Sequence, residues 1–559
     1  MPKATLTFAM RLFRVALALA LLCLIALTRV ALTWRVYTPT FDEPAHIAAG
    51  MEWLDRGVYR YEEMHPPLAR VADALGPWVA GLHSEGQTGI RREGNAILNQ
   101  RGDQSRALAL ARAGALPFLL LAILVVFAWA RSLAGDAAGL LAVLAFTSVP
   151  PVLAHAGLAT TDAAAMGTIA LAVYSMLRWL ERPGLHATLR LGLAVGLALL
   201  AKMSAVVFLP AAFVVVLLAW RTAGNPLASH IGGALVAGVV ALLVIWAGYR
   251  FSIGPINERA TTPGVAASPA QAGSVARPGS LKGRVAAIFR MPIFPAPEYV
   301  RGIREIRGEN RIGERRNYLL GEPIPDGRWS FFPVALGVKT PIPFLVLALV
   351  GTVALAVAAR ERRSALVPPL AALAMLLTAM AANIDIGVRL VLPMYPLLAV
   401  CAGVGILTLW HRRPRGRLRL AGPVSAVALT GWLVAESVRA HPDYLPYFNQ
   451  LAGKHPERVL LDSDLDWGQD LGRLADTLRA RGVPHAWIAY HGTVDLSRQG
   501  LPPYTELPPD QPVTGWVAAS LFRLALGSQG GPIDAYAWLR PYQPVARVGH
   551  SIMLYYIPL

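Results

Sequence analysis

Residues 15–27 form an uninterrupted apolar run, VALALALLCLIAL, and the polar stretch Thr40-Phe41-Asp42-Glu43-Pro44 follows soon after it. An apolar run with no charge predicts a helix that crosses a membrane. Several further runs of about 20 apolar residues occur, 55% of the 559 residues are hydrophobic, and only 15% are charged. Soluble domains are about a quarter charged. The sequence therefore predicts an integral membrane protein.

The apolar runs predict eleven helical spans and hence a polytopic α-helical membrane domain over residues 1–439. The spans cover about 11–33, 107–130, 137–157, 162–180, 188–203, 204–220, 231–249, 335–358, 365–382, 390–410 and 419–438. Composition changes at residue 440. Strand signals at 458–461, 485–490 and 551–556, with a helix signal at 466–480, predict a small α/β domain over 440–559.

Basic residues in short loops predict the orientation of the chain. Lys3, Arg11 and Arg14 precede the first span, and the short loops of the same parity carry the arginines of 178–190, 360–363 and 411–417. The positive-inside rule places these loops in the cytoplasm, together with the N-terminus. Three long segments, about 35–106, 250–334 and 440–559, then lie outside. The formal net charge is +18, and much of the arginine sits in these short loops, so no nucleic-acid partner is expected.

The first outer segment is expected to be folded. Asp42 followed by Pro44 predicts the start of one helix, and Pro66-Pro67 predicts the start of another. Apolar residues recur at helical spacing after both starts. We expect two amphipathic helices that lie in the membrane interface.

Acidic residues of this segment are candidates for catalysis. A carboxylate at the membrane surface, such as Asp42 or Glu43, can take the proton of an attacking hydroxyl, and partial burial near lipid would raise its pKa. A helix cap with a solvated neighbour is the alternative. His65, which follows Glu62 and Glu63, is a candidate phosphate donor or metal ligand, or part of an ordinary polar turn.

Charged residues at the predicted outer ends of spans are the second group of candidates. Arg112, Lys202 and Arg389 are costly near lipid and are functional candidates for that reason, unless they snorkel to lipid headgroups. Together they would stabilise the charge that develops on a departing phosphate. Asp162 either caps a helix or joins Asp42 in a cluster that holds a divalent cation.

The stretch Asp462-Ser463-Asp464-Leu465-Asp466-Trp467-Gly468-Gln469-Asp470 is similar to a calcium loop. Its glycine comes one place late and no glutamate closes the loop. A strand end, a turn and a capped helix are therefore favoured over calcium binding. The sequence contains no glycine-rich phosphate loop, so nothing supports ATP-driven transport.

The ordered motifs resemble the polyprenyl-phosphate-dependent glycosyltransferases of the GT-C superfamily, most closely the protein O-mannosyltransferase family (glycosyltransferase family 39) and the bacterial aminoarabinose transferases. The matching pieces are Phe41-Asp42-Glu43, His65-Pro66-Pro67-Leu68, Ala111-Arg112, Leu158-Ala159-Thr160-Thr161-Asp162, residues 196–202, 318–322, 339–341 and 389–393. Residues 441–449 and 464–470 resemble a bacterial branch with a C-terminal outer domain.

This resemblance implies transfer of a sugar from a polyprenyl-phosphate carrier, on the outer face of a bacterial inner membrane, to a protein, lipid or glycan acceptor. It implies Asp42 as catalytic base supported by Glu43, and His65, Arg112, Lys202 and Arg389 as donor contacts. Glu63 lies beside the position where aminoarabinose transferases carry a glutamate, so Asp42, Glu63 and Asp162 are the candidate metal ligands.

Two other classes of function are considered. A lipid-linked sugar flippase or transporter would place ionisable residues near the middle of the bilayer in broken helices. The acidic residues here gather at the predicted outer interface, which favours an enzyme. A purely structural scaffold would not need Asp42, Asp162 and Arg389 at one surface.

Overall fold

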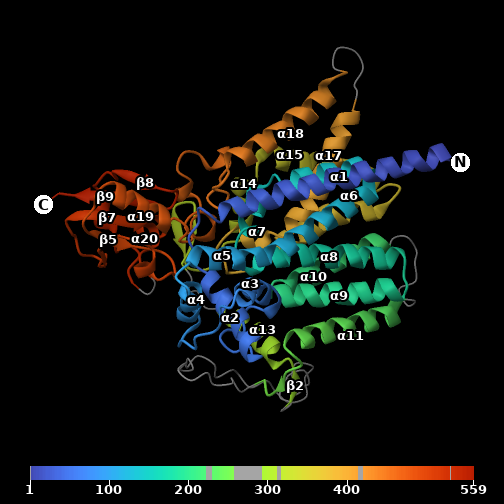
Figure 1. The fold of residues 1–559 in the computed structure, drawn as a ribbon. Coiled ribbons are helices and arrows are strands. Elements are labelled where there is room, and N and C mark those ends of the chain that lie inside the picture. Colours follow the sequence, from blue (N-terminus) through green and yellow to red (C-terminus); the bar gives the residue numbers. More distant parts are fainter. Residues whose placement is uncertain are drawn as a thin grey trace.

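The computed structural model describes residues 2–221, 230–256, 293–310, 316–412, 419–528 and 531–558. Most of the predicted basic loop 411–417 lies outside the described residues, as do residues 257–292 and 311–315 of the predicted outer segment 250–334. Helices dominate the described parts, and Figure 1 shows most of them side by side in one bundle.

Six helical segments of the described chain are long and apolar enough to cross a membrane, so the protein is a multi-pass membrane protein. They are Met10–Thr33 of α1 (Pro2–Thr33), Gln104–Phe146, α8 (Thr161–Glu181), α11 (Ile231–Gly248), α17 (Met394–His411) and α18 (Ala421–Arg439). A seventh candidate is the pair α14 (Phe331–Lys339) and α15 (Ile342–Ala358), which is bent by 110°.

The predicted number of eleven spans is not confirmed. Three of the predicted spans correspond to shorter apolar helices: α9 (Leu185–Ala201), α10 (Ala205–Arg221) and α16 (Val367–Ala379). The first two have 17 residues each and the third has 13. A straight helix needs about 20 residues to cross a hydrocarbon core of about 30 Å, so length alone does not qualify them.

Two predicted spans lie within α6 (Leu116–Phe146), which folds back on itself. The backbone leaves helical geometry at Ala134 and Gly135, where φ is −142° and 85°. A methyl group on Gly139 would lie 2.8 Å from the Phe127 ring. Along a straight helix, positions 127 and 139 would be about 18 Å apart, so the chain must reverse between them. The third predicted span continues into α7 (Pro150–Ala156).

Several loops that were predicted to share one side of the membrane meet at one end of the bundle. Arg11 donates to Asp136 at 2.8 Å and 3.0 Å, next to the reversal in α6. Arg362 donates to the Ser132 carbonyl and to Glu181, both at 3.0 Å. The start of α1, the reversal in α6 and the loops after α8 and α15 therefore lie at the same end of the bundle, as the basic residues in these segments predict.

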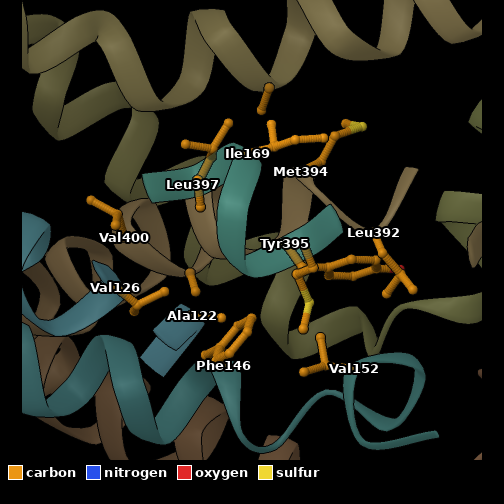
Figure 2. Close-up of a cluster of buried hydrophobic side chains, with 14 of the residues drawn as sticks. Ala122, Val126, Phe146, Val152, Ile169, Leu392, Met394, Tyr395, Leu397 and Val400 are labelled. Carbon is orange, nitrogen blue, oxygen red and sulfur yellow. The ribbon is translucent and has the colours of Figure 1, made fainter. Parts of the chain in front are cut away.

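The backbones of α15 and α17 touch through two glycines. A Cβ on Gly351 would lie 1.7 Å from the Cys401 carbonyl oxygen, and one on Gly405 would lie 2.1 Å from that of Leu347. Small residues allow such close approach of membrane helices. Around this contact, side chains of α6, α7, α8 and α17 belong to one apolar core, and Figure 2 shows members of this core, among them Phe146 and Tyr395.

We expect Gly351→Ala to destabilise the protein by about 1–3 kcal/mol or more, because the methyl group would force α15 away from α17. The measurement is the free energy of unfolding in detergent. Gly238→Ala in α11 is the matched control, since nothing lies within 4 Å of its added Cβ. Equal stability of the two variants would contradict the tight contact.

The first outer segment contains the two predicted helices and two more. They are α2 (Glu43–Arg56), α3 (Pro67–Val79), α4 (Ile90–Asn99) and α5 (Gln104–Arg112), and η1 (Ala113–Ala115) leads into α6. Ile47 and Met51 of α2 are fully buried, whereas Val79 of α3 is exposed. The apolar face of α2 is thus covered by the protein, whereas part of the apolar face of α3 is exposed.

Two small two-stranded sheets and one helix lie in the second outer segment among the described residues. The antiparallel pairs are β1 (Ile253–Gly254) with β2 (Phe294–Pro295) and β3 (Asn317–Leu319) with β4 (Glu322–Ile324). The helix is α13 (Pro297–Glu309). Arg389 follows in the 3₁₀ turn η4 (Val388–Val391), before α17.

The C-terminal region contains a five-stranded mixed sheet in the order β6-β5-β7-β9-β8. β5 (Ala486–Ala489) is parallel to β6 (Tyr504–Glu506) and β7 (Gly515–Ser520). β9 (Ile552–Ile557) runs antiparallel to both of its neighbours, β7 and β8 (Ala546–Val548). With α19 (Leu471–Ala480) and α20 (Leu521–Leu526) it lies at the opposite end of the bundle from the N-terminus (Figure 1).

One strand prediction is wrong. Residues 458–461 follow the 3₁₀ turn η7 (Pro456–Arg458) and pair with no strand of the described sheets. Leu460 and Leu461 are nevertheless buried, so their apolar character comes from packing in a loop. The predicted helix 466–480 begins later, at Leu471, because the residues before it form the 3₁₀ turn η8 (Asp462–Asp464) and a loop.

Candidate functional site

Asp42 and Arg389 form an ion pair between two elements that are 347 residues apart in sequence. Asp42 stands directly before α2, and Arg389 lies in η4. Arg389 Nη1 donates to Asp42 Oδ2 at 2.7 Å. The Asp42 side chain is 25% exposed, whereas that of Arg389 is 9% exposed. Asp42 therefore offers a carboxylate that is held in place yet remains accessible.

Asp42 is not used as a helix cap. It occupies the position before α2, but its side chain makes no capping hydrogen bond there. Burial raises the pKa of Asp42, but the charge of Arg389, with smaller contributions from His46 and His65, outweighs it, so the pKa lies below its ordinary value. The expectation of a raised pKa is thus wrong, because it omitted the ion pair.

Asp162 extends this ion pair into a cluster. It is buried at the start of α8, where its Oδ1 accepts a hydrogen bond from Lys202 Nζ. Its Oδ2 lies 3.8 Å from Arg389 Nη1 and accepts from Thr160 Oγ1 at 3.1 Å. Two cations and two carboxylates thus alternate, and we refer to Asp42, Asp162, Lys202 and Arg389 as the Arg389 cluster.

Glu43 and Arg112 form a second, fully buried pair. Glu43 accepts from Arg112 Nε at 2.7 Å and from Nη2 at 2.8 Å. It also accepts from the backbone N–H groups of Thr40 at 2.7 Å and Ala159 at 2.9 Å. The remaining Arg112 donors bind the carbonyls of Tyr37 and Thr38. The pair joins α2, α5 and the loop before α8.

The expected contact between Arg112 and a donor phosphate does not fit this geometry, because the guanidinium is 0% exposed and fully engaged. Glu43 is equally enclosed. Two neighbouring carboxylates therefore differ in kind: Asp42 is accessible, and Glu43 fixes the backbone around it.

His65 belongs to a polar network that the sequence did not reveal. Its Nδ1 lies 2.8 Å from Glu62 Oε1, and Glu62 also pairs with Arg70. Arg70 Nε donates to His46 Nδ1 at 2.8 Å. The rings of His46 and His65 stand edge to face at 5.2 Å. His65 is 25% exposed and remains a candidate ligand contact, whereas His46 and Arg70 are buried.

The three predicted metal ligands do not come together. Glu63 binds Arg301 of α13 at 2.7–3.0 Å through three hydrogen bonds. Asp42 and Asp162 share Arg389 instead of a cation site. Among the described residues, no group of three or more His, Cys, Asp or Glu side chains is arranged to hold a metal ion. In this structure the three carboxylates make salt bridges, and the candidate metal set stays a prediction.

Trp467 is a member of the site that sequence analysis assigned to a turn. The Arg389 guanidinium carbon lies 4.4 Å from the centre of the Trp467 ring, a cation–π geometry. Trp467 and its neighbours are fixed to the first outer segment, since Phe41 N donates to the Trp467 carbonyl at 3.0 Å and Thr38 N donates to that of Gln469 at 3.1 Å. Trp467 is thus placed against Arg389 from the C-terminal region.

Residues 102–246 match the family model of dolichyl-phosphate-mannose-protein mannosyltransferase. No curated protein matches the chain. The structure of ArnT from Cupriavidus metallidurans bound to undecaprenyl phosphate is similar, with 15% identity, a TM-score of 0.46, and coverage of 96% of this chain and 97% of ArnT.

Two further solved structures are similar over smaller parts. The oligosaccharyltransferase AglB from Archaeoglobus fulgidus, in complex with an inhibitory peptide and a dolichol-phosphate, has 14% identity and a TM-score of 0.49, covering 76% of this chain and 56% of AglB. The S. cerevisiae Pmt1-Pmt2 complex bound to the sugar donor has 19% identity and a TM-score of 0.34, covering 42% of this chain and 33% of that one.

The class of protein is therefore a multi-pass membrane protein. Within this class, the resemblance to the protein O-mannosyltransferase family is confirmed by the match over residues 102–246, a stretch that contains Arg112, Asp162 and Lys202.

Proposed function

We propose that this protein transfers a sugar from a polyprenyl-phosphate carrier to an acceptor hydroxyl at the outer surface of a bacterial inner membrane. The observation that carries the proposal is the Arg389 cluster. It holds an accessible carboxylate, Asp42, against the Arg389 guanidinium, and the same guanidinium lies near Asp162, which pairs with the Lys202 ammonium. Carboxylate and cations are the groups that hydroxyl attack and phosphate departure require.

In this mechanism the donor phosphate binds Arg389 and Lys202 and competes with Asp42 for the guanidinium. Arginine recognises phosphate oxygens through its planar fork of donors. Asp42, released from its ion pair, becomes more basic, because the charge that lowers its pKa is now shared with phosphate. Donor binding would therefore activate the base.

The transfer step is a single displacement. The acceptor oxygen forms a bond to the anomeric carbon while the bond between this carbon and the phosphate oxygen breaks. Polyprenyl phosphate leaves with the electron pair, and the acceptor proton moves to Asp42. The configuration at the anomeric carbon would therefore be inverted. NMR of the product tests this step, and a retained configuration would contradict a single displacement.

The proposal also includes a membrane arrangement. Residues 1–439 would form the catalytic membrane domain, with its eleven apolar segments and a cytoplasmic N-terminus. Residues 440–559 would form the outer α/β domain. The Arg389 cluster and the C-terminal sheet would then lie at the outer face, opposite the end that carries Arg11 and Arg362.

A strain that lacks the gene tests the function. We expect mass spectrometry of its lipids and glycans to find one sugar missing from an acceptor and the same sugar accumulated on polyprenyl phosphate. Complementation with the wild-type gene should reverse both changes. A transporter would move the lipid-linked sugar without forming a new glycosidic bond, so purified protein that makes no product from any lipid-linked sugar would contradict the proposal.

We expect Arg389→Lys to lower kcat/KM by about tenfold to a hundredfold with little change in melting temperature. Lysine keeps the charge, but its single ammonium cannot serve Asp42, Asp162 and a phosphate together as the guanidinium fork can. Turnover of undecaprenyl-phosphate-linked sugar is the measurement. Arg362→Lys at the opposite end of the bundle is the control, and equal activity of both variants would remove Arg389 from the site.

A further inference from the structure

The segment 462–464 is attached to the residues that come directly before Arg389. Ser463 Oγ donates to the Ile386 carbonyl at 2.6 Å, and Val388 N donates to Asp464 Oδ1 at 3.1 Å. A Cβ on Gly387 would lie 2.2 Å from Ser463 Oγ, so the two chains touch. The C-terminal region therefore places Asp462 next to the Arg389 cluster.

Asp462 has an oxygen to offer. Its Oδ1 accepts from the neighbouring Ser463 N–H at 2.6 Å, whereas its Oδ2 has no hydrogen-bond partner among the described residues. The residue is partly exposed. The charges of Arg389 and Asp42 both act on its carboxyl, in keeping with the attachment of this segment to residues 386–388.

The backbone at Asp462 is in the left-handed region, with φ at 50°. Few residues other than glycine adopt this conformation, although aspartate and asparagine tolerate it better than most. The hydrogen bonds of Ser463 and Asp464 hold it there. The fold thus keeps a carboxyl at a position where glycine would be less strained.

We propose that Asp462 binds hydroxyl groups of the transferred sugar. This inference rests on the proposed function. The phosphate of the donor would lie at Arg389 and Lys202, and its lipid tail must lead towards the membrane helices. The sugar, one bond from the phosphate, then lies on the side of the C-terminal region, where Asp462 stands.

The protonation of Asp462 supports this role. Burial raises its pKa, the negative charge of Asp42 adds to this effect, and Arg389 opposes it, so that the pKa is about 7. Near neutral pH such a carboxyl both accepts and donates hydrogen bonds. Sugar hydroxyl groups likewise act as donors and acceptors, so the two are complementary.

Binding of two lipids tests the proposal: undecaprenyl phosphate without a sugar, and undecaprenyl phosphate carrying mannose, glucose or 4-aminoarabinose, whichever the wild type binds most tightly. We expect Asp462→Asn and Asp462→Gly to bind undecaprenyl phosphate as the wild type does. We expect Asp462→Gly to bind the lipid-linked sugar about tenfold to a hundredfold more weakly, the range for one hydrogen bond to a charged group, and Asp462→Asn to lose less, because its amide keeps a donor and an acceptor but not the charge. Asp462→Gly is chosen because glycine suits the left-handed backbone.

Asp476→Asn on α19 is the control, since its side chain is 74% exposed. Unchanged binding of the lipid-linked sugar by both Asp462 variants would overturn the inference, as would a defect confined to the KM of the acceptor. Equal affinity of the wild type for undecaprenyl phosphate with and without the sugar would also overturn the inference, although binding of the carrier would stand. Failure of the wild type to bind undecaprenyl phosphate at all would instead contradict the proposed function.

Discussion

Asp42→Asn is expected to lower sugar transfer by about 10²–10⁴-fold, the contribution typical of a positioned general base, while the protein folds and inserts normally. Asparagine fills the same space but cannot take a proton from the acceptor. The ion pair with Arg389 is lost, yet Arg389 still lies against Trp467 and near Asp162. The fold around it is therefore preserved.

The measurement is single-turnover transfer from a lipid-linked sugar, with the melting temperature in detergent as the check on folding. Asp136→Asn is the control, because this residue pairs with Arg11 at the opposite end of the bundle. Turnover near the wild-type rate would remove Asp42 from the role of base.

Glu43→Gln is expected to act through stability instead. Its carboxylate and the Arg112 guanidinium are fully buried, and removing one partner of such a pair leaves the other charge uncompensated. This typically costs about 3–5 kcal/mol. We expect a lower melting temperature and poor recovery of folded protein in detergent, whatever the activity of the fraction that folds.

A double variant separates the pair from its surroundings. Glu43→Gln with Arg112→Met removes both charges, so its cost should be smaller than the sum of the two single changes. Additive costs would mean that the two side chains do not stabilise each other. A stable Glu43→Gln protein that is inactive would contradict the division of roles between Asp42 and Glu43.

The membrane character of the chain was predictable because apolar runs of this length are typical of helices that cross a bilayer and are rare elsewhere. The number of spans was not, since a window of apolar residues does not reveal where a helix stops. The apolar stretch 188–220 is divided at Lys202, where the backbone becomes extended. The reversal at Ala134 and Gly135 was predictable only as a gap between two predicted spans, 107–130 and 137–157.

The members of the Arg389 cluster were predictable as candidates, because charges at the ends of apolar runs are costly. Their pairing was not. Arg112 and Arg389 carry the same signal in sequence, yet one is locked to Glu43 and the other to an accessible carboxylate. The salt bridge of Glu63 could not be predicted for the same reason, since its partner Arg301 is 238 residues away. Long-range contacts decide which charge is structural and which is available.

Residues 462–470 were the largest omission. Their acidic pattern suggested a calcium loop or a helix start, and no local rule connects Trp467 with Arg389. The same holds for His46, whose bond to Arg70 joins two helices of the outer segment.

The hydrogen bonds from Thr38 and Phe41 to the 467–469 strip have a consequence for biosynthesis. Residues 38–41 are synthesised early in translation, whereas residues 467–469 are synthesised late. A nascent or truncated polypeptide that ends before Trp467 lacks this side of the candidate site, even when its membrane helices are inserted. If the proposed function holds, activity is acquired late in translation, and incomplete chains would not consume the carrier lipid.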